Sequence, residues 1–274
     1  MTFGARLRAA MDARGPLCAG IDPHTALLRD WGLPDTVAGL EQFALTAAEA
    51  LGPSVAAVKP QSAFFERFGS GGIEVLERTI RTCREGGALV VLDVKRGDIG
   101  STVQAYADAY LDPASPIAAD AVTASPYLGF DSLAPMLETA RKHDAGVFVL
   151  ALTSNPEGPQ FQGATTVDGR SVAATVLDSL RAANEDADPL GSFGAVVGAT
   201  IGDVRVDLDI NGPLLVPGIG AQGGTADDVR RIFEGVLDAV LPSSSREILG
   251  AGPDPATLRA AAERTAAEFA ALVG

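Results

Sequence analysis

Residues 88–102 read ALVVLDVKRGDIGST, an apolar run followed at once by charged side chains. The run predicts a buried strand, and Asp93, Lys95 and Asp98 come at its carboxyl end. Alternate residues of a strand point to the same face, so we expect Asp93 and Lys95 to point together into the interior. Burying a carboxylate and an ammonium costs several kcal/mol per ion unless partners compensate. The charged segment therefore indicates a function more than a stabilising device.

Short apolar runs alternate with helical patterns on both sides of this segment. We expect strands at residues 17–22, 55–59, 88–95, 119–123, 146–152, 194–198, 214–217 and 239–243. We expect helices at residues 37–51, 73–84, 101–110, 132–143, 172–185 and 225–235. Eight strands that alternate with helices predict the α/β class with a parallel sheet, and this number favours a closed (β/α)8 TIM barrel. A doubly wound open sheet is the alternative.

The 274 residues are expected to form one barrel domain, residues 1–274, with a helix at each end. The N-terminal stretch has an amphipathic helical pattern and not that of a signal peptide. The last helix is expected over residues 254–272, with Asp254 as N-cap and Pro255 in the first turn. Residues 155–169 include five glycines or prolines and predict a mobile loop.

Composition excludes several classes of protein. No apolar stretch reaches the roughly 18 residues of a membrane span, so we expect a cytoplasmic protein without membrane contact. The formal net charge of −14 argues against nucleic-acid binding, and any anionic ligand then needs a local positive site. Two cysteines, Cys18 and Cys83, and two histidines, His24 and His143, support neither a disulfide framework nor a metal site.

Polar side chains follow most of the predicted strands. They are Asp22, Lys59, Asp93 with Lys95, Thr153 with Ser154, Gln222 and Arg246. A barrel collects the carboxyl ends of its strands at one face, where such enzymes place their active sites. Asp22 before Pro23 is also compatible with a simple turn, and Lys59 with a side chain that extends to solvent. The group Asp93, Lys95 and Asp98 is harder to explain as structure alone.

A second segment predicts phosphate binding. Residues 217–224 read PGIGAQGG, a glycine-rich turn between a predicted strand and the helix that begins near Thr225. Free backbone N–H groups and a helix N-terminus converge there, and Arg246 after the eighth strand would lie beside them. Neither piece has a Walker or Rossmann pattern, so neither a nucleoside triphosphate nor a dinucleotide cofactor is indicated.

Taken together, DVKRGDIGST, the upstream Lys59, LTSNP with Ser154, PGIGAQGG and Arg246 resemble the orotidine 5'-phosphate decarboxylase family. SPYLGF at residues 125–130 and SSSRE at residues 243–247 resemble its longer bacterial branch, type 2. The resemblance implies conversion of orotidine monophosphate to uridine monophosphate and carbon dioxide in de novo pyrimidine biosynthesis. It also implies a homodimeric barrel and a reaction without metal or organic cofactor.

The resemblance also implies a role for each matching residue. Lys95 is implied as the proton donor, and Lys59, Asp93 and Asp98 complete a charged array. Asp98 and Thr102 are implied to reach into the active site of the neighbouring subunit. The implied substrate contacts are Asp22 and Lys59 to the ribose, Ser154 to the pyrimidine, and Gln222 with Arg246 to the phosphate. Ser245 stands where many relatives have glycine, which leaves the backbone contact to phosphate at that position open.

Three alternatives remain at this point. A magnesium-dependent sugar-phosphate decarboxylase or synthase of the same barrel superfamily shares the Asp-x-Lys-x-x-Asp pattern. An aldolase would instead use a lysine to form a Schiff base. A nucleotide-binding barrel without catalytic activity is the third. Dependence on metal, borohydride trapping and binding without turnover would distinguish them.

Overall fold

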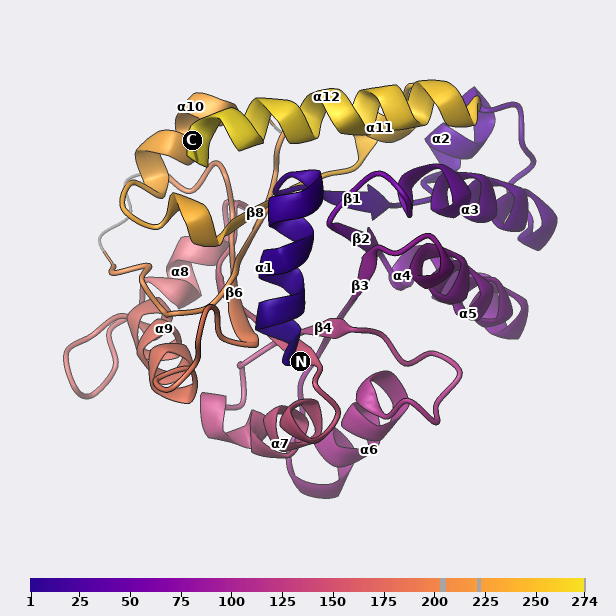
Figure 1. Ribbon diagram of the computed structural model, residues 1–274. Coiled ribbons are helices and arrows are strands. Elements are labelled where there is room, and N and C mark those ends of the chain that lie inside the picture. The colour runs from indigo at the N-terminus through magenta and orange to yellow at the C-terminus, as the bar shows by residue number, and fades with distance from the viewer. Residues whose placement is uncertain (203–205, 221–222, 274) are drawn as a thin grey trace.

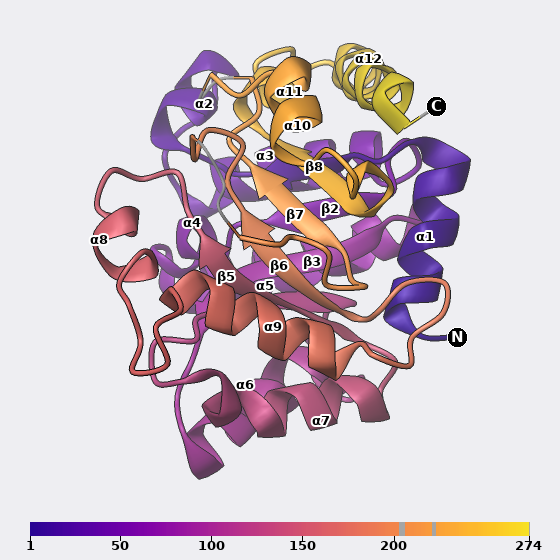
Figure 2. The same cartoon turned by 90° about the vertical axis from the view of Figure 1, so that its left-hand side faces the viewer.

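The computed structural model describes residues 1–202, 206–220 and 223–273, and it contains a closed barrel of eight parallel strands (Figures 1 and 2). Each strand pairs with the next along the chain, and β8 pairs with β1 to close the barrel. The strands are β1 (Cys18–Ile21), β2 (Ala57–Pro60), β3 (Leu89–Arg96), β4 (Ala121–Ala124), β5 (Gly146–Leu152), β6 (Phe193–Val197), β7 (Leu214–Pro217) and β8 (Val240–Ser244). The predicted barrel is confirmed, and the open sheet is wrong.

Helices surround the barrel and cap its ends. They are α1 (Phe3–Arg14), α2 (Thr25–Asp30), α3 (Val37–Leu51), α4 (Ala63–Glu66), α5 (Gly69–Glu85), α6 (Gly100–Leu111), α7 (Ala134–Lys142), α8 (Gly158–Gln162), α9 (Val172–Ala183), α10 (Ala226–Ile232), α11 (Arg246–Leu249) and α12 (Pro255–Val273). Two 3₁₀ segments, η1 (Phe130–Leu133) and η2 (Leu237–Ala239), precede α7 and β8. The helices expected from the sequence are all present, with ends shifted by a few residues. The short helices α2, α4, α8 and α11 are too brief to show a period in the sequence.

Local chemistry explains where several helices begin. Thr36 caps α3 and Ser171 caps α9, each accepting a backbone N–H with its hydroxyl oxygen. Thr225 and Asp228 form a reciprocal capping box at α10. Asp254 accepts the N–H of Ala256 at 2.8 Å, as expected for the N-cap of the last helix. No helix among residues 1–202, 206–220 and 223–273 combines the length and apolar character needed to span a membrane.

The strands are buried on both faces, and β3 shows how the two faces divide. Leu89 and Val91 belong to the inner core of the barrel, whereas Val90 and Leu92 pack outward against the helices. The alternation carries on to Asp93, which therefore points inward at the carboxyl end of the strand. The predicted orientation of Asp93 is confirmed.

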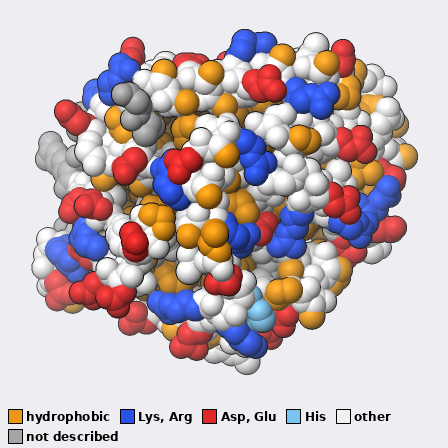
Figure 3. Space-filling view, in the orientation of Figure 1, with side chains coloured by type: hydrophobic (Ala, Val, Ile, Leu, Met, Phe, Trp, Pro, Cys, Tyr) orange, Lys and Arg blue, Asp and Glu red, His pale blue; other side chains and the backbone are white. Residues whose placement is uncertain are grey.

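Helix α1 closes the amino-terminal end of the barrel. Phe3 is fully buried, and its ring meets the ring of Phe148 edge to face at a centroid distance of 6.0 Å. Only glycine fits at Gly146, since a Cβ there would lie 2.3 Å from the Phe3 ring. In Figure 2, α1 lies at one end of the barrel and α8 at the other. Basic and acidic side chains are interspersed over the face that α1 covers (Figure 3). Because α1 closes this end, we look for a ligand site at the opposite end of the barrel, where the strands have their carboxyl ends.

A buried carboxylate ties α1 and α5 to the barrel. Asp120 accepts hydrogen bonds from Arg6 at 2.7 Å, from Arg84 at 3.1 Å and from the backbone N–H of Val90 at 2.9 Å. Burial would raise the pKa of Asp120, but hydrogen bonds and charge from Arg84 and Arg6 lower it below its usual value. The carboxylate therefore stabilises the fold in its ionised form.

We expect Asp120→Asn to lower the free energy of unfolding at pH 7. Breaking a fully buried pair costs about 3–5 kcal/mol, but both arginines are partly exposed and screened by solvent, so we expect about 2 kcal/mol. Because the folded pKa is depressed, the contribution is present above the usual value of 3.8 and disappears as the pH falls below it. Urea denaturation of both proteins between pH 7 and pH 3 measures this difference.

The matched control is Asp12→Asn, which removes an exposed carboxylate paired with Arg8 on α1. It should change the free energy of unfolding by less than about 0.5 kcal/mol. A difference between the Asp120 variant and the wild type that widened at low pH would contradict the assigned ionisation.

Candidate active site

A cavity of 470 Å³ opens at the carboxyl ends of the strands. All eight strands, or the segments just after them, contribute residues to its wall. The polar residues that line it are Asp22, His24, Lys59, Gln61, Asp93, Lys95, Thr123, Thr153, Ser154, Asn155, Ser243, Ser245 and Arg246. Its apolar floor includes Leu150, Val196 and Leu215. A pocket of this size that combines apolar surface with convergent charges is typical of a small-molecule site.

Asp93 is the centre of the charged group in this cavity. Its Oδ2 accepts a hydrogen bond from Nζ of Lys59 at 3.0 Å, and its Oδ1 accepts one from Nζ of Lys95 at 2.6 Å. The hydroxyl of Thr123 also donates to Oδ1, at 2.7 Å. Three donors on one carboxylate compensate for the burial of Asp93, which is 6% exposed.

The same contacts determine the charge states of the group. Burial would raise the pKa of Asp93, but the ammonium groups of Lys59 and Lys95 hold it well below its usual value. Burial would lower the pKa of Lys59, but the carboxylates of Asp93 and Asp22 raise it. Asp93 is therefore a carboxylate, and Lys59 an ammonium, at neutral pH.

Lys95 reaches the cavity by an irregular backbone. Its φ of +44° lies in the left-handed region, and the pairing of β3 with β4 shifts register between Leu92 and Arg96. The backbone N–H of Lys95 donates to the hydroxyl of Thr123 at 2.9 Å. The Lys95 side chain is 45% exposed, whereas that of Asp93 is buried. The sequence predicts that Asp93 and Lys95 point together, which is confirmed, but Lys95 does so from an irregular backbone and not by regular alternation.

Of the seven other predicted site residues, four line the cavity, two do not, and one lies outside the described residues. Asp22, Lys59, Ser154 and Arg246 line the cavity with Asp93 and Lys95. Oδ1 of Asp22 is buried without a hydrogen-bond partner among the described residues, which is uncommon for a carboxylate oxygen. Gln222 lies outside the described residues.

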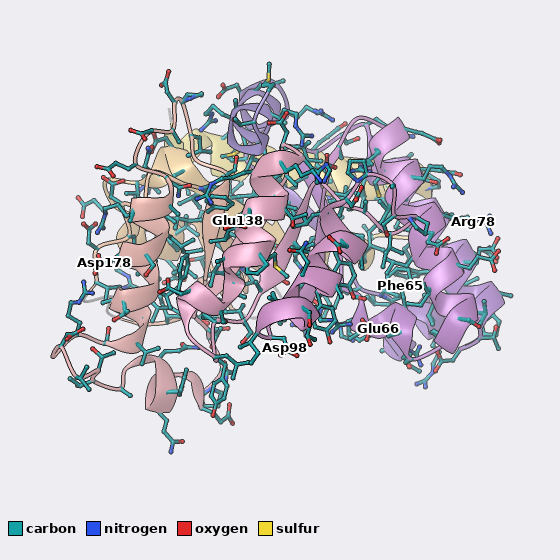
Figure 4. The ribbon with its side chains drawn as sticks, turned by 90° about the horizontal axis from the view of Figure 1, so that it is seen from below. Phe65, Glu66, Arg78, Asp98, Glu138 and Asp178 are labelled. Carbon is teal, nitrogen blue, oxygen red and sulfur yellow. The ribbon has the colours of Figure 1, made fainter. Side chains whose placement is uncertain are left out.

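Asp98 and Thr102 do not line the cavity that holds Asp93 and Lys95. Oδ1 of Asp98 accepts the N–H of Ile99 at 2.8 Å, just before α6. In Figure 4, Asp98 is labelled toward the edge opposite α1, where the carboxyl ends of the strands lie. Thr102 is exposed in the first turn of α6. Within one chain, Asp98 therefore lies at the same end of the barrel as the cavity, and neither Asp98 nor Thr102 lines it.

Several cavity residues are not predicted from the sequence. The His24 ring contacts the Phe64 ring at a centroid distance of 4.1 Å and an interplanar angle of 58°, and Thr123 lies between Asp93 and Lys95. Thr123 ends a predicted strand, so the rule that selects Asp22 and Lys59 could have selected it as well. Ser243 likewise ends the predicted eighth strand and lines the cavity.

Ser245 has room in the wall because Gly20 lies opposite. A Cβ on Gly20 would stand 2.6 Å from Cβ of Ser245, which is closer than side chains can approach. The hydroxyl oxygen of Ser245 is buried without a hydrogen-bond partner among the described residues. The Ser245 side chain therefore fits because Gly20 on β1 has no side chain.

The segment after β5 is ordered by its own side chains. Gln162 at the end of α8 accepts the backbone N–H of Thr153 at 2.9 Å and donates to its hydroxyl at 2.7 Å. The Thr153 hydroxyl in turn donates to Asn155 at 2.6 Å. The loop expected over residues 155–169 therefore contains a short helix that returns to the end of the strand beside Ser154.

Cysteine and metal chemistry find little support in the described residues. Cys18 and Cys83 are free and buried, and burial raises the pKa of each thiol to about 12. Within the part of the chain that the structure describes, no three His, Cys, Asp or Glu side chains form a group able to hold a metal ion.

Comparison with known proteins identifies close relatives. The model of the Orotidine 5'-phosphate decarboxylase / HUMPS family matches residues 15–261. The orotidine 5'-phosphate decarboxylase of a Nocardioides species is 65% identical over 266 residues, covering 96% of this chain and 97% of the relative. That of Streptomyces coelicolor is 60% identical, covering 99% and 98%.

Solved structures agree with these relatives. A crystal structure described as a putative orotidine 5'-phosphate decarboxylase from Streptomyces avermitilis superposes with a TM-score of 0.97 at 61% identity, covering 99% of this chain and 96% of that one. The OMP decarboxylase of Leishmania donovani superposes with a TM-score of 0.77 at 32% identity, covering 99% of both chains. The similarity thus extends over the whole barrel and includes every segment that lines the cavity.

Proposed function

Since the chain belongs to the orotidine 5'-phosphate decarboxylase family and converts orotidine monophosphate to uridine monophosphate and carbon dioxide, we propose that Lys95 protonates the pyrimidine in this reaction. The observation that carries the proposal is the ion-paired group in the cavity, where Asp93 joins the ammonium groups of Lys59 and Lys95. The name of the matching family model also includes HUMPS. The relatives at 60–65% identity, however, are named orotidine 5'-phosphate decarboxylases.

The chemistry explains why a fixed ammonium is needed. When the bond between C6 and the carboxylate breaks, its electron pair stays on C6 in the plane of the ring, where the π system cannot delocalise it. A positive charge held beside C6 stabilises this carbanion directly. A proton then passes from Nζ of Lys95 to C6, which leaves the lysine neutral and completes uridine monophosphate. Asp93 orients Lys95 through the contact of 2.6 Å.

The remaining cavity residues are proposed to hold the rest of the nucleotide. Asp22, with its unpaired Oδ1, and Lys59 would bind the ribose hydroxyls. Ser154 would bind the pyrimidine ring, and Arg246 the phosphate, together with Gln222. Binding energy from the phosphate, remote from C6, would favour closure of the surrounding loops and exclude water.

A homodimer would complete the site, with Asp98 and Thr102 contributed by the neighbouring subunit. This proposal is supported by the position of Asp98 at the same end of the barrel as the cavity, and by the fact that neither residue lines the cavity of its own chain. Ile99, between them in sequence, is 61% exposed and offers apolar surface for an interface. The cytoplasmic location and the absence of nucleic-acid partners stay predictions.

The activity itself is tested by mixing the purified chain with orotidine monophosphate in a chelator and following its ultraviolet absorbance. We expect the same rate with and without chelator, because the proposed mechanism uses Lys95 in place of a metal. A rate abolished by the chelator and restored by magnesium would favour the magnesium-dependent alternative. Borohydride trapping of a lysine adduct with substrate would instead favour a Schiff base.

Mixing two inactive variants tests the shared site. Lys95→Ala and Asp98→Ala proteins with different affinity tags are mixed until tandem purification shows that mixed dimers form. If Asp98 acts in the neighbouring site, random assortment restores about a quarter of the wild-type sites, because half of the dimers are mixed and each has one intact site. Mixed dimers that stay inactive would contradict the contribution across the interface.

A further inference from the structure

Thr123 on β4 connects the two charged residues of β3 through one hydroxyl group. This hydroxyl donates to Oδ1 of Asp93 at 2.7 Å and accepts the backbone N–H of Lys95 at 2.9 Å. The residue is 1% exposed and lines the cavity. It therefore bonds to the carboxylate that orients Lys95 and to the backbone from which the Lys95 side chain starts.

The direction of both hydrogen bonds is determined by chemistry. The backbone N–H of Lys95 can only donate, so the Thr123 oxygen must accept from it. A hydroxyl has a single hydrogen, and Asp93 is held as a carboxylate that can only accept. The hydrogen of Thr123 is therefore directed at Asp93, and no other side chain on this part of β4 replaces either contact.

The backbone at Lys95 requires such a support. A φ of +44° is uncommon for a residue with a long side chain, and it persists only where the surroundings hold it. Because the register between β3 and β4 shifts between Leu92 and Arg96, regular strand pairing does not hold Lys95. The Thr123 hydroxyl takes the place of that missing backbone acceptor.

We propose that Thr123 is a positioning residue, which holds the left-handed backbone of Lys95 and the carboxylate of Asp93 so that the Lys95 ammonium is aimed at the reacting carbon. The inference rests on the proposed roles of Lys95 and Asp93. Thr123 acts through these two residues, and the ribose and phosphate contacts proposed for Asp22 and Arg246 do not depend on it. Its removal should therefore affect turnover more than substrate binding.

The test compares Thr123→Val, which keeps the shape but removes the hydroxyl, with Thr123→Ser, which keeps the hydroxyl. Misplacement of a reacting group by about 1 Å costs on the order of 10²-fold, so we expect kcat of Thr123→Val to fall by about 10- to 100-fold. KM should change by less than about threefold, since binding contacts are retained. Thr123→Ser should recover kcat to within about threefold of wild type.

Thr79→Val is the matched control. Thr79 is a buried threonine of α5 whose hydroxyl donates to the Val75 carbonyl at 2.8 Å, away from the cavity. The Thr79→Val variant should keep the kcat of the wild type even if its melting temperature is lower. If Thr123→Val does not fold, Thr123→Ala removes the same hydroxyl with less bulk and is judged by the same criteria.

The outcomes separate this inference from the proposed function. Normal kcat in both hydroxyl-free variants, with Lys95→Ala inactive, overturns the role of Thr123 and leaves that of Lys95. Normal kcat in Lys95→Ala overturns the proposed function itself. Equal losses in Thr123→Ser and Thr123→Val, or a loss confined to KM, would also overturn the positioning role.

Discussion

Lys95→Ala is expected to lower kcat/KM for orotidine monophosphate by at least about 10⁴-fold without unfolding the protein. Removing one preorganised electrostatic contact to a developing anion costs about 10²- to 10³-fold, and removing a general acid costs about 10²- to 10⁴-fold. Lys95 is proposed to supply both effects. Its side chain is 45% exposed, so truncation leaves no large cavity in the core.

Steady-state rates and a thermal unfolding curve for the purified variant measure this prediction. Lys142→Ala is the control, since it removes an exposed lysine of α7 outside the cavity, and its rates should match wild type. Asp93 keeps Lys59 as a partner in the Lys95 variant, which supports its folding. Turnover of Lys95→Ala within tenfold of wild type would eliminate Lys95 as the proton donor.

Arg246→Ala is expected to lower kcat/KM by about 10²- to 10³-fold, mainly through KM. A hydrogen bond to a charged group contributes about 1.5–3 kcal/mol, and a guanidinium can make two to one phosphate. The formal net charge of −14 makes a local cation more important, because the rest of the chain repels an anionic nucleotide. A smaller loss of kcat is expected where phosphate binding drives loop closure.

Ligands with and without phosphate sharpen this second test. Affinity for uridine monophosphate should fall in Arg246→Ala, whereas affinity for uridine should stay the same. Arg259→Ala on α12 is the control, since Arg259 is exposed and does not line the cavity. An equal loss of affinity for both ligands would show that Arg246 acts on the shape of the site and not on the phosphate.

The two substitutions examine two different parts of one cavity. Lys95 belongs to the charged group around Asp93, and the exposed Arg246 begins α11. A loss mainly in kcat for Lys95→Ala and mainly in KM for Arg246→Ala would distinguish the chemical step from phosphate binding. The proposed use of remote binding energy additionally requires some loss of kcat in Arg246→Ala.

Much of the fold follows from local patterns in the chain. The strands expected at residues 146–152 and 214–217 coincide with β5 and β7, and the helix expected at residues 37–51 coincides with α3. Such segments are long enough, or apolar enough, for their period to identify them. The short helices α8 and α11 could not be identified in this way, since each covers little more than one turn.

The sequence by itself determined the barrel, the inward direction of Asp93 and the end of the molecule where the charges collect. The direction of Asp93 follows from the period of two along one strand, and the barrel and its charged end follow from the number and alternation of strands along the chain. Only the tertiary structure decided that Thr123 supports Lys95 from 28 residues away, and that Gly20 makes room for Ser245. The alternating pattern of a strand predicts the face on which a residue lies. The register between neighbouring strands determines which side chains that residue contacts.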